Sequence, residues 1–387
     1  MRILFVAMQE SIHTARWINQ IADQGWDIRL FPVSAAPVSP ELRNLTAYGL
    51  PLFASRNMHE SSRYIGLLPI GRKGSNMEKL IFRAYPHLWD TLLANRIRSL
   101  KPDIVHSLEF QHAGYMTLAA REKLGRNFPT WVVTNWGSDI YLYGRLVEHR
   151  KKIEAILAAC DYYACECRRD VKLAIDMGLA GKVLPTFPNT GGFDLARVAA
   201  LRQPGKVSAR RLILLKGYQH WAGRALVGLH ALSLCRDSLD GYELAIYSAA
   251  PEVMIAAQLF EQDTGIPVRI IPPCSHDEML SLYGRARIYI GLSISDAIST
   301  SLLEAMVMGA FPIQSCTSCA NEWITNNESG FIVPPEDAAI IAEAIRRALK
   351  EDSLVDHASE INALVATERL DQTKIRPQVI KMYQDIY

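Results

Sequence analysis

The chain has 387 residues, 49% of them hydrophobic, which is enough material for two domains with sizeable cores. Its formal net charge of +2 excludes a strong electrostatic bias toward nucleic acid. The seven cysteines are scattered and odd in number, and no histidines accompany them at zinc-like spacing. They therefore indicate neither a disulfide framework nor a metal site.

The opening residues, MRILFVAMQES, form too short an apolar run for a signal peptide or a membrane span. We therefore expect a cytoplasmic protein. Residues 55–100 mix aromatic and basic side chains, and such a surface could rest at the inner face of an anionic membrane. The alternative is a solvated charged helix face with a packed apolar side. The residues concerned are Arg63, Tyr64, Arg72, Lys73, Lys79, Phe82, Arg83, Tyr85, Trp89, Arg96 and Arg98.

The first half of the chain alternates short apolar runs with amphipathic segments. Arg2–Ala7 and Asp27–Phe31 read as strands, with a helix between them that ends at Gly25. The loop between the first strand and this helix lacks G-x-G-x-x-G, so a dinucleotide fingerprint is not supported. Further strands are expected at 103–106, 131–134 and 161–165, and further helices at 114–123 and 166–179.

The second half repeats this alternation after a stretch rich in Pro and Gly, and we place the domain boundary near Gly205. Two rounds of strand and helix predict two doubly wound α/β domains. The expected strands are 211–215, 242–247, 268–271 and 330–333; the expected helices are 224–235, 251–265, 275–286 with Ser275 as cap, 334–350 with Pro at its start, and 372–387.

Ile288–Ile313 is the stretch most typical of a ligand site. An apolar strand is followed by a polar loop, a helix that Gly309 can end in the left-handed conformation, and a returning strand. Such βαβ units bind ligands beyond the carboxyl ends of their strands. The free amides at the helix start, around Ser299, Thr300 and Ser301, favour phosphate oxygens.

Two acids frame that loop, Asp296 and Glu304, with seven residues between them. A carboxylate accepts two hydrogen bonds, which suits adjacent sugar hydroxyls. The alternative is local, because Ser301 and Glu304 have the spacing of a capping box.

This arrangement resembles the acid-x7-acid motif of retaining GT-B glycosyltransferases, the large family 4, group 1-like class. The resemblance implies that Asp296, where relatives usually carry Glu, holds the donor sugar's hydroxyls. It implies that Glu304 holds the ribose, and that the amides between them hold the diphosphate. It further implies two Rossmann-like domains facing across a cleft: 1–204 for the acceptor, 205–370 for the nucleotide sugar, and a helix at 371–387 packing back on the first domain.

The text KPDIVHSLEF…TWVVTNWGSDI is similar to a second piece of the same family. The match covers Gly137, Ser138 and Asp139, whereas Trp136 stands where relatives carry His. From their positions in the loops, we expect His112 or Asp139 to supply the polar contact that this His makes in relatives. Trp136 is either a stacking platform for an acceptor sugar or a core residue. His13, in the first loop, either faces the acceptor or packs at the helix start.

Lys216 and Arg224 flank the loop KGYQHWAGRA, which also contains Gly217. Preorganised cations stabilise the charge that develops on a leaving diphosphate, and the equivalent loop of relatives supplies an Arg and a Lys. The alternative is a pair of solvated basic side chains. With two cations no metal is expected. The nucleotide base would lie near Tyr247, Ser248 and residues 271–275.

The sequence thus predicts a retaining glycosyltransferase of the hexosyltransferase type. The donor would be a UDP- or GDP-linked sugar, and the acceptor a glycan, a lipid-linked sugar or a small molecule in cell-envelope or polysaccharide biosynthesis. Peripheral membrane contact stays open, and no nucleic-acid partner is expected. Two alternatives remain: a sugar-nucleotide-binding protein that has lost catalysis, and a GT-B sugar-nucleotide epimerase.

Overall fold

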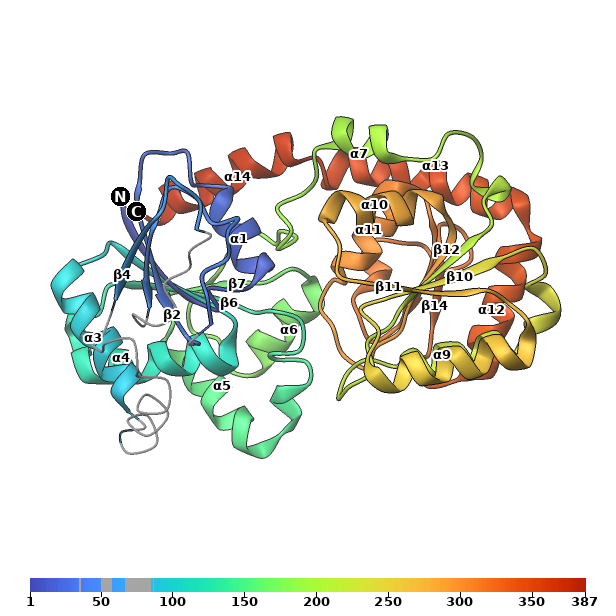
Figure 1. Cartoon of the computed structure of the whole chain (residues 1–387). Coiled ribbons are helices and arrows are strands. Elements are labelled where there is room, and N and C mark those ends of the chain that lie inside the picture. Colours follow the sequence, from blue (N-terminus) through green and yellow to red (C-terminus); the bar gives the residue numbers. More distant parts are fainter. Residues whose placement is uncertain (35, 50–57, 67–84, 86) are drawn as a thin grey trace, which may run out of the picture. The chain divides into compact units, whose positions relative to one another are not determined.

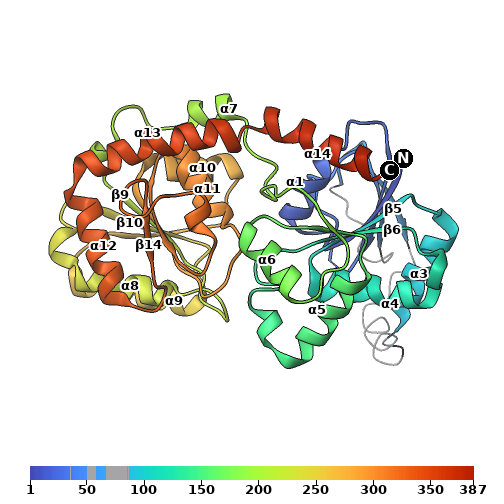
Figure 2. The same cartoon turned by 180° about the vertical axis from the view of Figure 1, so that it is seen from behind.

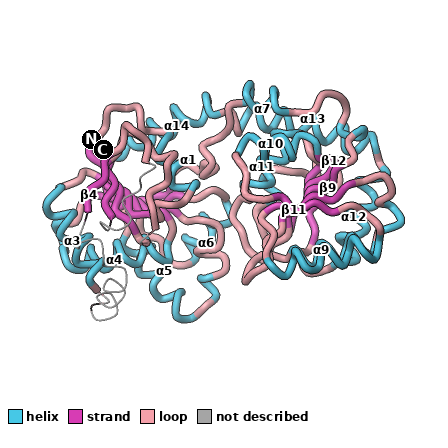
Figure 3. Tube along the Cα trace, viewed as in Figure 1, coloured by secondary structure: helices cyan, strands magenta, loops and turns pink. Residues whose placement is uncertain are grey.

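The computed structural model describes residues 1–34, 36–49, 58–66, 85 and 87–387. The chain divides into two compact units, the first made of residues 1–191 and 375–387, the second of residues 192–374. In each unit, parallel strands are flanked by helices (Figures 1 and 3). Within the predicted basic and aromatic surface, Arg72, Lys73, Lys79, Phe82 and Arg83 lie outside the described residues. Across the described ranges, no helix is both long enough and apolar enough to cross a membrane.

The first unit is built on one parallel sheet with the strand order β4-β3-β2-β1-β5-β6-β7-β8. The chain reverses its direction across the sheet between β1 and β5, so the switch point lies at their carboxyl ends. The strands are β1 (Arg2–Ala7), β2 (Asp27–Pro32), β3 (Thr46–Gly49), β4 (Arg63–Gly66), β5 (Ile104–Leu108), β6 (Thr130–Thr134), β7 (Tyr162–Ala164) and β8 (Lys182–Val183).

Helices cover this sheet and fix the loops at its carboxyl edge. A short π-helical turn, η2 (Phe110–Gly114), follows β5 directly and leads into α4. The longer helices are α1 (Ile12–Asn19), α3 (Leu88–Leu100), α4 (Tyr115–Leu124), α5 (Val147–Ala159), α6 (Arg168–Asp176) and α14 (Gln372–Ile386), with 3₁₀ turns η3 (Gly125–Asn127) and η4 (Tyr143–Arg145).

The C-terminal helix α14 packs into the core of the first unit. Trp17 Nε1 donates to the hydroxyl of Tyr383 at 2.9 Å, and the same hydroxyl lies 2.7 Å from Nδ1 of His106. His106 Nε2 lies 2.6 Å from Thr134 Oγ1, within hydrogen-bond distance. Burial lowers the pKa of His106 to about 3, so the imidazole is neutral in the folded core.

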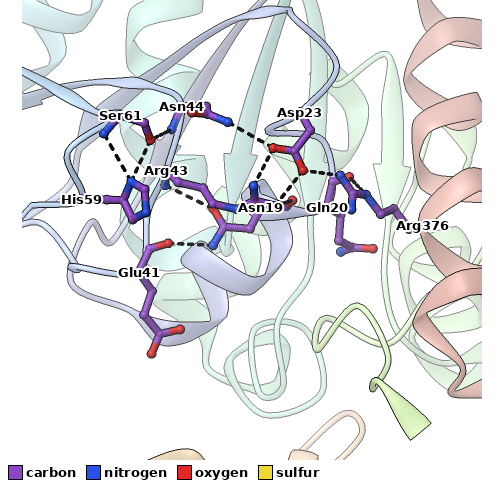
Figure 4. A network of polar contacts seen from close by, with 9 residues as sticks. All are labelled: Asn19, Gln20, Asp23, Glu41, Arg43, Asn44, His59, Ser61 and Arg376. Atoms are coloured by element: carbon purple, nitrogen blue, oxygen red, sulfur yellow. Dashed lines mark hydrogen bonds and ion pairs between the residues drawn. The ribbon is translucent and has the colours of Figure 1, made fainter. Parts of the chain in front are cut away.

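A surface network fastens the start of α14 to the same unit (Figure 4). Arg376 donates to the Asp23 carboxylate at 2.6 Å and to the Gln20 carbonyl at 2.9 Å. Arg43 contacts the same carboxylate through two nitrogens, at 2.5 and 2.9 Å. The hydrogen bond from Arg43 is the main reason why the pKa of Asp23 is lowered. The C-terminal helix is thus held by one buried and one exposed polar cluster.

The second unit has one parallel sheet with the order β11-β10-β9-β12-β13-β14. Counted within the unit this is 3-2-1-4-5-6, the order of doubly wound nucleotide-binding sheets, whose switch point lies between the first and fourth strands. Those strands here are β9 and β12. The bounds are β9 (Leu212–Lys216), β10 (Glu243–Tyr247), β11 (Val268–Ile271), β12 (Ala286–Gly291), β13 (Phe311–Ser315) and β14 (Phe331–Val333).

The helices of the second unit form two packed groups. One group joins α8, α9 and α12, and the other joins α7, α10, α11 and α13 (Figure 2). The helices are α7 (Leu195–Leu201), α8 (Ala225–Leu234), α9 (Pro251–Thr264), α10 (His276–Arg285), α11 (Thr300–Met308), α12 (Ala338–Lys350) and α13 (Asp352–Arg369), with short turns η5 (Val207–Ala209), η6 (Arg236–Ser238) and η7 (Ala320–Glu322).

The two doubly wound α/β folds are confirmed, but some predicted boundaries are wrong. The division falls between residues 191 and 192 rather than near Gly205, because α7 packs on α10 and α11 and Arg202 donates to the Val307 carbonyl. Helix α12 begins at Ala338 with Asp337 as its cap, not at a proline. Helices α5, α7 and α13 were not predicted.

Candidate functional site

A pocket of about 140 Å³ opens at the carboxyl ends of β9, β12 and β13. This is the switch point of the second sheet, where a doubly wound fold leaves room for a ligand. Three of the predicted site residues lie in its wall: Lys216, Asp296 and Ser299. The other lining residues are Tyr218, His220, Trp221, Ala222, Gly223, Tyr289, Gly291, Leu292, Ser293, Ser295 and Gln314.

Two loops that form the pocket are joined through their backbones. Arg224 N donates to the Leu292 carbonyl at 3.1 Å, and Ile294 N donates to the Ala222 carbonyl at 2.9 Å. The close turn of the first loop requires Gly223, since a Cβ there would lie 2.3 Å from the Tyr218 carbonyl oxygen. The pocket wall is therefore fixed by hydrogen bonds rather than by side-chain packing alone.

Lys216 is the last residue of β9 and brings a cation into this wall. Burial by itself would lower its pKa, but Tyr289, Asp296 and Glu304 favour the charged form, and the net pKa is raised. The ammonium nitrogen lies 4.6 Å from the centre of the Tyr218 ring, a cation–π distance. The charged form of Lys216 is thus favoured in the wall that it shares with Asp296.

Helix α11 begins at Thr300 with Ser299 as its cap, and the Ser299 side chain makes no capping hydrogen bond. The amides of the first turn therefore have no side-chain cap, and Ser299 beside them lines the pocket. The alternative of a capping box between Ser301 and Glu304 is wrong, because the helix starts before Ser301. The Ser301 hydroxyl instead accepts from Tyr247 Oη at 2.9 Å. The predicted left-handed end at Gly309 is confirmed, with φ of 80°.

Glu304 lies in the buried face of α11, and its Oε1 is 2.9 Å from Nε2 of His276. His276 is the first residue of α10, whose start is fixed by a capping box between Ser275 and Glu278. The predicted cap at Ser275 is confirmed. The contact between His276 and Glu304 was not anticipated, because the two residues are far apart in sequence.

The side chain of Arg224 contacts Glu336 rather than lining the pocket with Lys216. Its Nε lies 2.9 Å from Glu336 Oε1, and its Nη1 donates to the Gly223 carbonyl at 2.9 Å. Among the described residues, the set that lines the pocket does not include it. The structure therefore brings together Lys216 and Asp296, but not the pair of cations expected from the loop.

The remaining predicted residues of the second unit shape the backbone. Gly217 N donates to the Tyr247 carbonyl at 2.8 Å, and a Cβ at this glycine would lie 2.6 Å from Ala249 Cα. Tyr247 is buried, and its hydroxyl lies 2.8 Å from that of Tyr283. Ser248 has φ of 51°, in the left-handed region. These contacts position the loop after β10 against the loop after β9.

Asp139 and His112 belong to the first unit, at the carboxyl ends of β6 and β5. Asp139 Oδ2 accepts from the amides of Trp136 at 2.7 Å and Phe110 at 3.0 Å. Burial, followed by the nearby Glu109 carboxylate, raises the pKa of Asp139 well above its usual range. The pKa of His112 is raised, chiefly by its hydrogen bond with Glu109. Both residues thus interact with the loop formed by η2.

Trp136 and His13 lie against each other, with ring centroids 5.9 Å apart and planes at 66°. Trp136 packs on the core, and its indole Nε1 is buried with no hydrogen-bond partner in the part of the chain that the structure describes. The contacts of the Trp136 ring agree with a core residue. The unpartnered nitrogen leaves open the alternative that the ring stacks on an acceptor sugar.

Sequence reasoning missed the aromatic side of the pocket. Tyr218, His220 and Trp221 lie in the loop KGYQHWAG after a predicted strand, and Trp221 is 54% exposed. An exposed cluster of rings in a βα loop is the signal that could have identified them. Tyr289 and Gln314, which sit within strands, carried no such signal.

Two family models match this chain. Residues 257–363 match the model described as "Glycosyl transferases group 1", which includes α10, α11 and both acids of the motif. Residues 91–165 match the model described as "Glycosyl transferase 4-like", which includes β5, β6 and the loop that carries Asp139. No curated protein matches the chain.

Solved structures share the fold over the whole chain. Sucrose-phosphate synthase from Thermosynechococcus elongatus is 16% identical, with 100% of this chain and 99% of that chain covered and a TM-score of 0.69. A glycosyltransferase from Rickettsia africae is also 16% identical, with 100% and 98% covered and a TM-score of 0.68. Anabaena Alr3699/HepE, in complex with UDP-glucose, is 12% identical, with full coverage of both chains and a TM-score of 0.69. These structures show that the chain has the GT-B fold, and the two family models match parts of it to group 1-like glycosyltransferases.

Proposed function

We propose that this glycosyltransferase moves a sugar, with retention of configuration, from a UDP- or GDP-linked donor to an acceptor hydroxyl. The observation that carries the proposal is the pocket at the switch point of the second unit. There Lys216, Asp296 and Ser299 line one wall, beside the uncapped first turn of α11. Cation, amides and carboxylate are the groups that a diphosphate linked to a sugar requires.

Each of these groups has a separate task in the proposal. Lys216 and the amides of Thr300 and Ser301 bind the diphosphate and stabilise the charge that develops as it leaves. Asp296 accepts hydrogen bonds from the hydroxyls of the donor sugar. Glu304, whose carboxylate is oriented by His276, accepts from the ribose hydroxyls. No metal is assigned a role.

The reaction breaks the bond between the anomeric carbon and the diphosphate oxygen, and forms a bond between that carbon and the acceptor oxygen. The acceptor attacks from the side on which the diphosphate leaves, and its proton passes to a diphosphate oxygen. Charge balance at the leaving group then depends on Lys216, whose pKa is raised by neighbouring anionic groups despite burial. The products are a nucleoside diphosphate and a glycosylated acceptor.

The acceptor is proposed to bind on the first unit, at the carboxyl ends of β1, β5 and β6. Trp136 offers a ring face, and His112, 64% exposed at its side chain, offers a polar edge. A glycan or lipid-linked sugar of the cell envelope is the proposed class. The complexes of Alr3699/HepE with UDP, and with UDP and glucose, support a uridine nucleotide as the first donor to test.

A thermal-shift screen of UDP-glucose, UDP-galactose, UDP-N-acetylglucosamine and GDP-mannose tests the donor, because a ligand that prefers the folded state raises its stability. We expect at least one to raise the melting temperature, and NMR of the product to show the donor's anomeric configuration. An inverted product would refute retention. Failure of every nucleotide and nucleotide sugar to bind would refute the donor site.

One observation favours a second candidate, a sugar-nucleotide-binding protein without catalysis. Trp136 replaces the expected His, and Asp296 is one methylene shorter than the expected Glu. If wild type binds a nucleotide sugar but neither hydrolyses nor transfers it, the double variant Trp136→His with Asp296→Glu distinguishes the candidates. Recovered turnover would indicate a lost activity, and intact binding without turnover would favour the binding role.

A further inference from the structure

The loop between β9 and α8 carries a histidine, His220, that the glycosyltransferase motifs do not assign. It lines the pocket together with Lys216 and Asp296. Its ring packs against two aromatic neighbours of the same loop, with centroids 5.5 Å from Tyr218 and 5.4 Å from Trp221. The imidazole is therefore held at the pocket wall by residues next to it in sequence.

The backbone determines which nitrogen of this ring carries the proton. Nδ1 accepts hydrogen bonds from the amides of Ala222 at 3.1 Å and Gly223 at 3.5 Å. An amide can only donate, so Nδ1 is unprotonated and the neutral ring carries its proton on Nε2. Within the described part of the chain, no residue hydrogen-bonds to Nε2. One edge of the ring is thus engaged with its own loop, and the donor edge is available to a ligand.

The surrounding charges keep the ring neutral. Burial, and then the cations Lys216 and Arg224, lower the pKa of His220. A neutral donor can therefore share the pocket with the Lys216 ammonium without mutual repulsion. Arg224, whose Nε contacts Glu336 at 2.9 Å, is directed elsewhere.

We propose that His220 donates its Nε2 proton to a diphosphate oxygen of the donor nucleotide, as the second side-chain donor beside Lys216. A diphosphate oxygen is an acceptor only, so the tautomer imposed by the loop is the one that can bind it. The inference rests on the proposed donor site and adds a residue to it. It also explains how the diphosphate could be bound with Lys216 as the one cation in the pocket wall, since Arg224 pairs with Glu336.

The variant His220→Asn separates this role from a structural one. The Asn Oδ1 can accept from the amides of Ala222 and Gly223 as Nδ1 does, but the side chain is too short to place a donor at the position of Nε2. We expect UDP to bind on the order of 10- to 100-fold more weakly, the effect of removing a hydrogen bond to a charged group. Uridine binding, followed by ligand-observed NMR, and the melting temperature should stay unchanged.

Two further variants sharpen the test. His220→Gln can place a donor nitrogen near the position of Nε2, so it should retain more UDP affinity than His220→Asn. His230→Asn, a matched exchange on an exposed position of α8, should leave UDP and uridine binding unchanged.

The outcomes are distinguishable. Wild-type affinity for UDP in His220→Asn would overturn the inference alone. An equal loss for UDP and uridine would also overturn it, because a contact with the diphosphate cannot weaken a nucleoside that lacks one. If neither UDP nor GDP binds wild type, the donor site itself fails, and the inference fails with it.

Discussion

The two units build the same kind of carboxyl edge but use its polar residues differently. In the second unit, Lys216 and Asp296 line a pocket, and the helix that follows starts without a side-chain cap. In the first unit, Asp139 accepts hydrogen bonds from amides of its own loop and of the loop after β5, and Glu109 accepts from an amide of its own loop. A polar residue after a parallel strand is thus equally compatible with binding a ligand and with holding a loop. In this chain, Lys216 and Asp296 line a pocket, whereas Asp139 and Glu109 hold backbone amides in place.

The largest expected effect is at Lys216, at the edge to which we assign the donor nucleotide. Lys216→Ala should reduce kcat/KM for the nucleotide sugar by about 10²- to 10³-fold, because it removes a preorganised charge from the leaving diphosphate. Steady-state kinetics with the donor found in the thermal screen would measure this, and circular dichroism would verify folding. A decrease of less than tenfold would show that the diphosphate is held elsewhere.

Asp139 provides the contrasting case in the first unit. Asp139→Ala leaves two amides without their acceptor and should lower the free energy of unfolding by about 2–4 kcal/mol. UDP affinity, which we assign to the second unit, should be unchanged. Asp139→Asn is the matched control, since one amide oxygen can accept from both Phe110 and Trp136 as Oδ2 does. If the Ala variant is fully stable, the comparison between the edges is wrong.

His106 makes the stability of the first unit depend on pH. The pKa of His106 is lowered to about 3 in the folded protein, whereas the ordinary value for a histidine is 6.5. Below pH 6.5 the unfolded chain therefore binds a proton at His106 more readily than the folded protein does. The contribution of His106 to the free energy of unfolding is therefore fully present above pH 6.5. It should fall by about 1.4 kcal/mol per pH unit as the pH drops from 6.5 toward 3. Urea unfolding between pH 7.5 and 5 measures this slope. The variant His106→Gln should remove this residue's share of the slope, and an unchanged slope would contradict the account.

The smallest effect is expected at Arg224. Its contact with the exposed Glu336 resembles a surface ion pair, which contributes about 0–1 kcal/mol to stability. Arg224→Ala should therefore reduce turnover far less than Lys216→Ala does, in the same kinetic assay. An equal loss would show that Arg224 exchanges Glu336 for the diphosphate during the reaction, as the sequence resemblance implies.

The sequence predicted the fold better than the details of the site. Apolar runs that alternate with helices sufficed for the two α/β folds, because parallel strands buried on both faces must be apolar. The motif around Asp296 and Glu304 predicted the position of helix α11 beside the pocket, and Gly309 predicted where this helix ends. Helix α13 was not predicted, although only Glu351 separates it from α12.

Side-chain direction could not be read from the sequence. Lys216 and Arg224 look equivalent in the loop KGYQHWAGRA, yet one lines the pocket and the other contacts Glu336, more than a hundred residues away. The same holds for His276 and Glu304, which meet because α10 packs on α11. Such pairings depend on tertiary contacts, and local spacing carries no information about them.

A crystal structure with bound UDP, or with GDP if the thermal screen favours it, tests the central claim most directly. The account predicts a diphosphate against Lys216 Nζ and the first-turn amides of α11, with the ribose hydroxyls toward Glu304. A nucleotide bound at another edge of the second unit, or on the first unit, with the pocket lined by Lys216 and Asp296 empty, would contradict it.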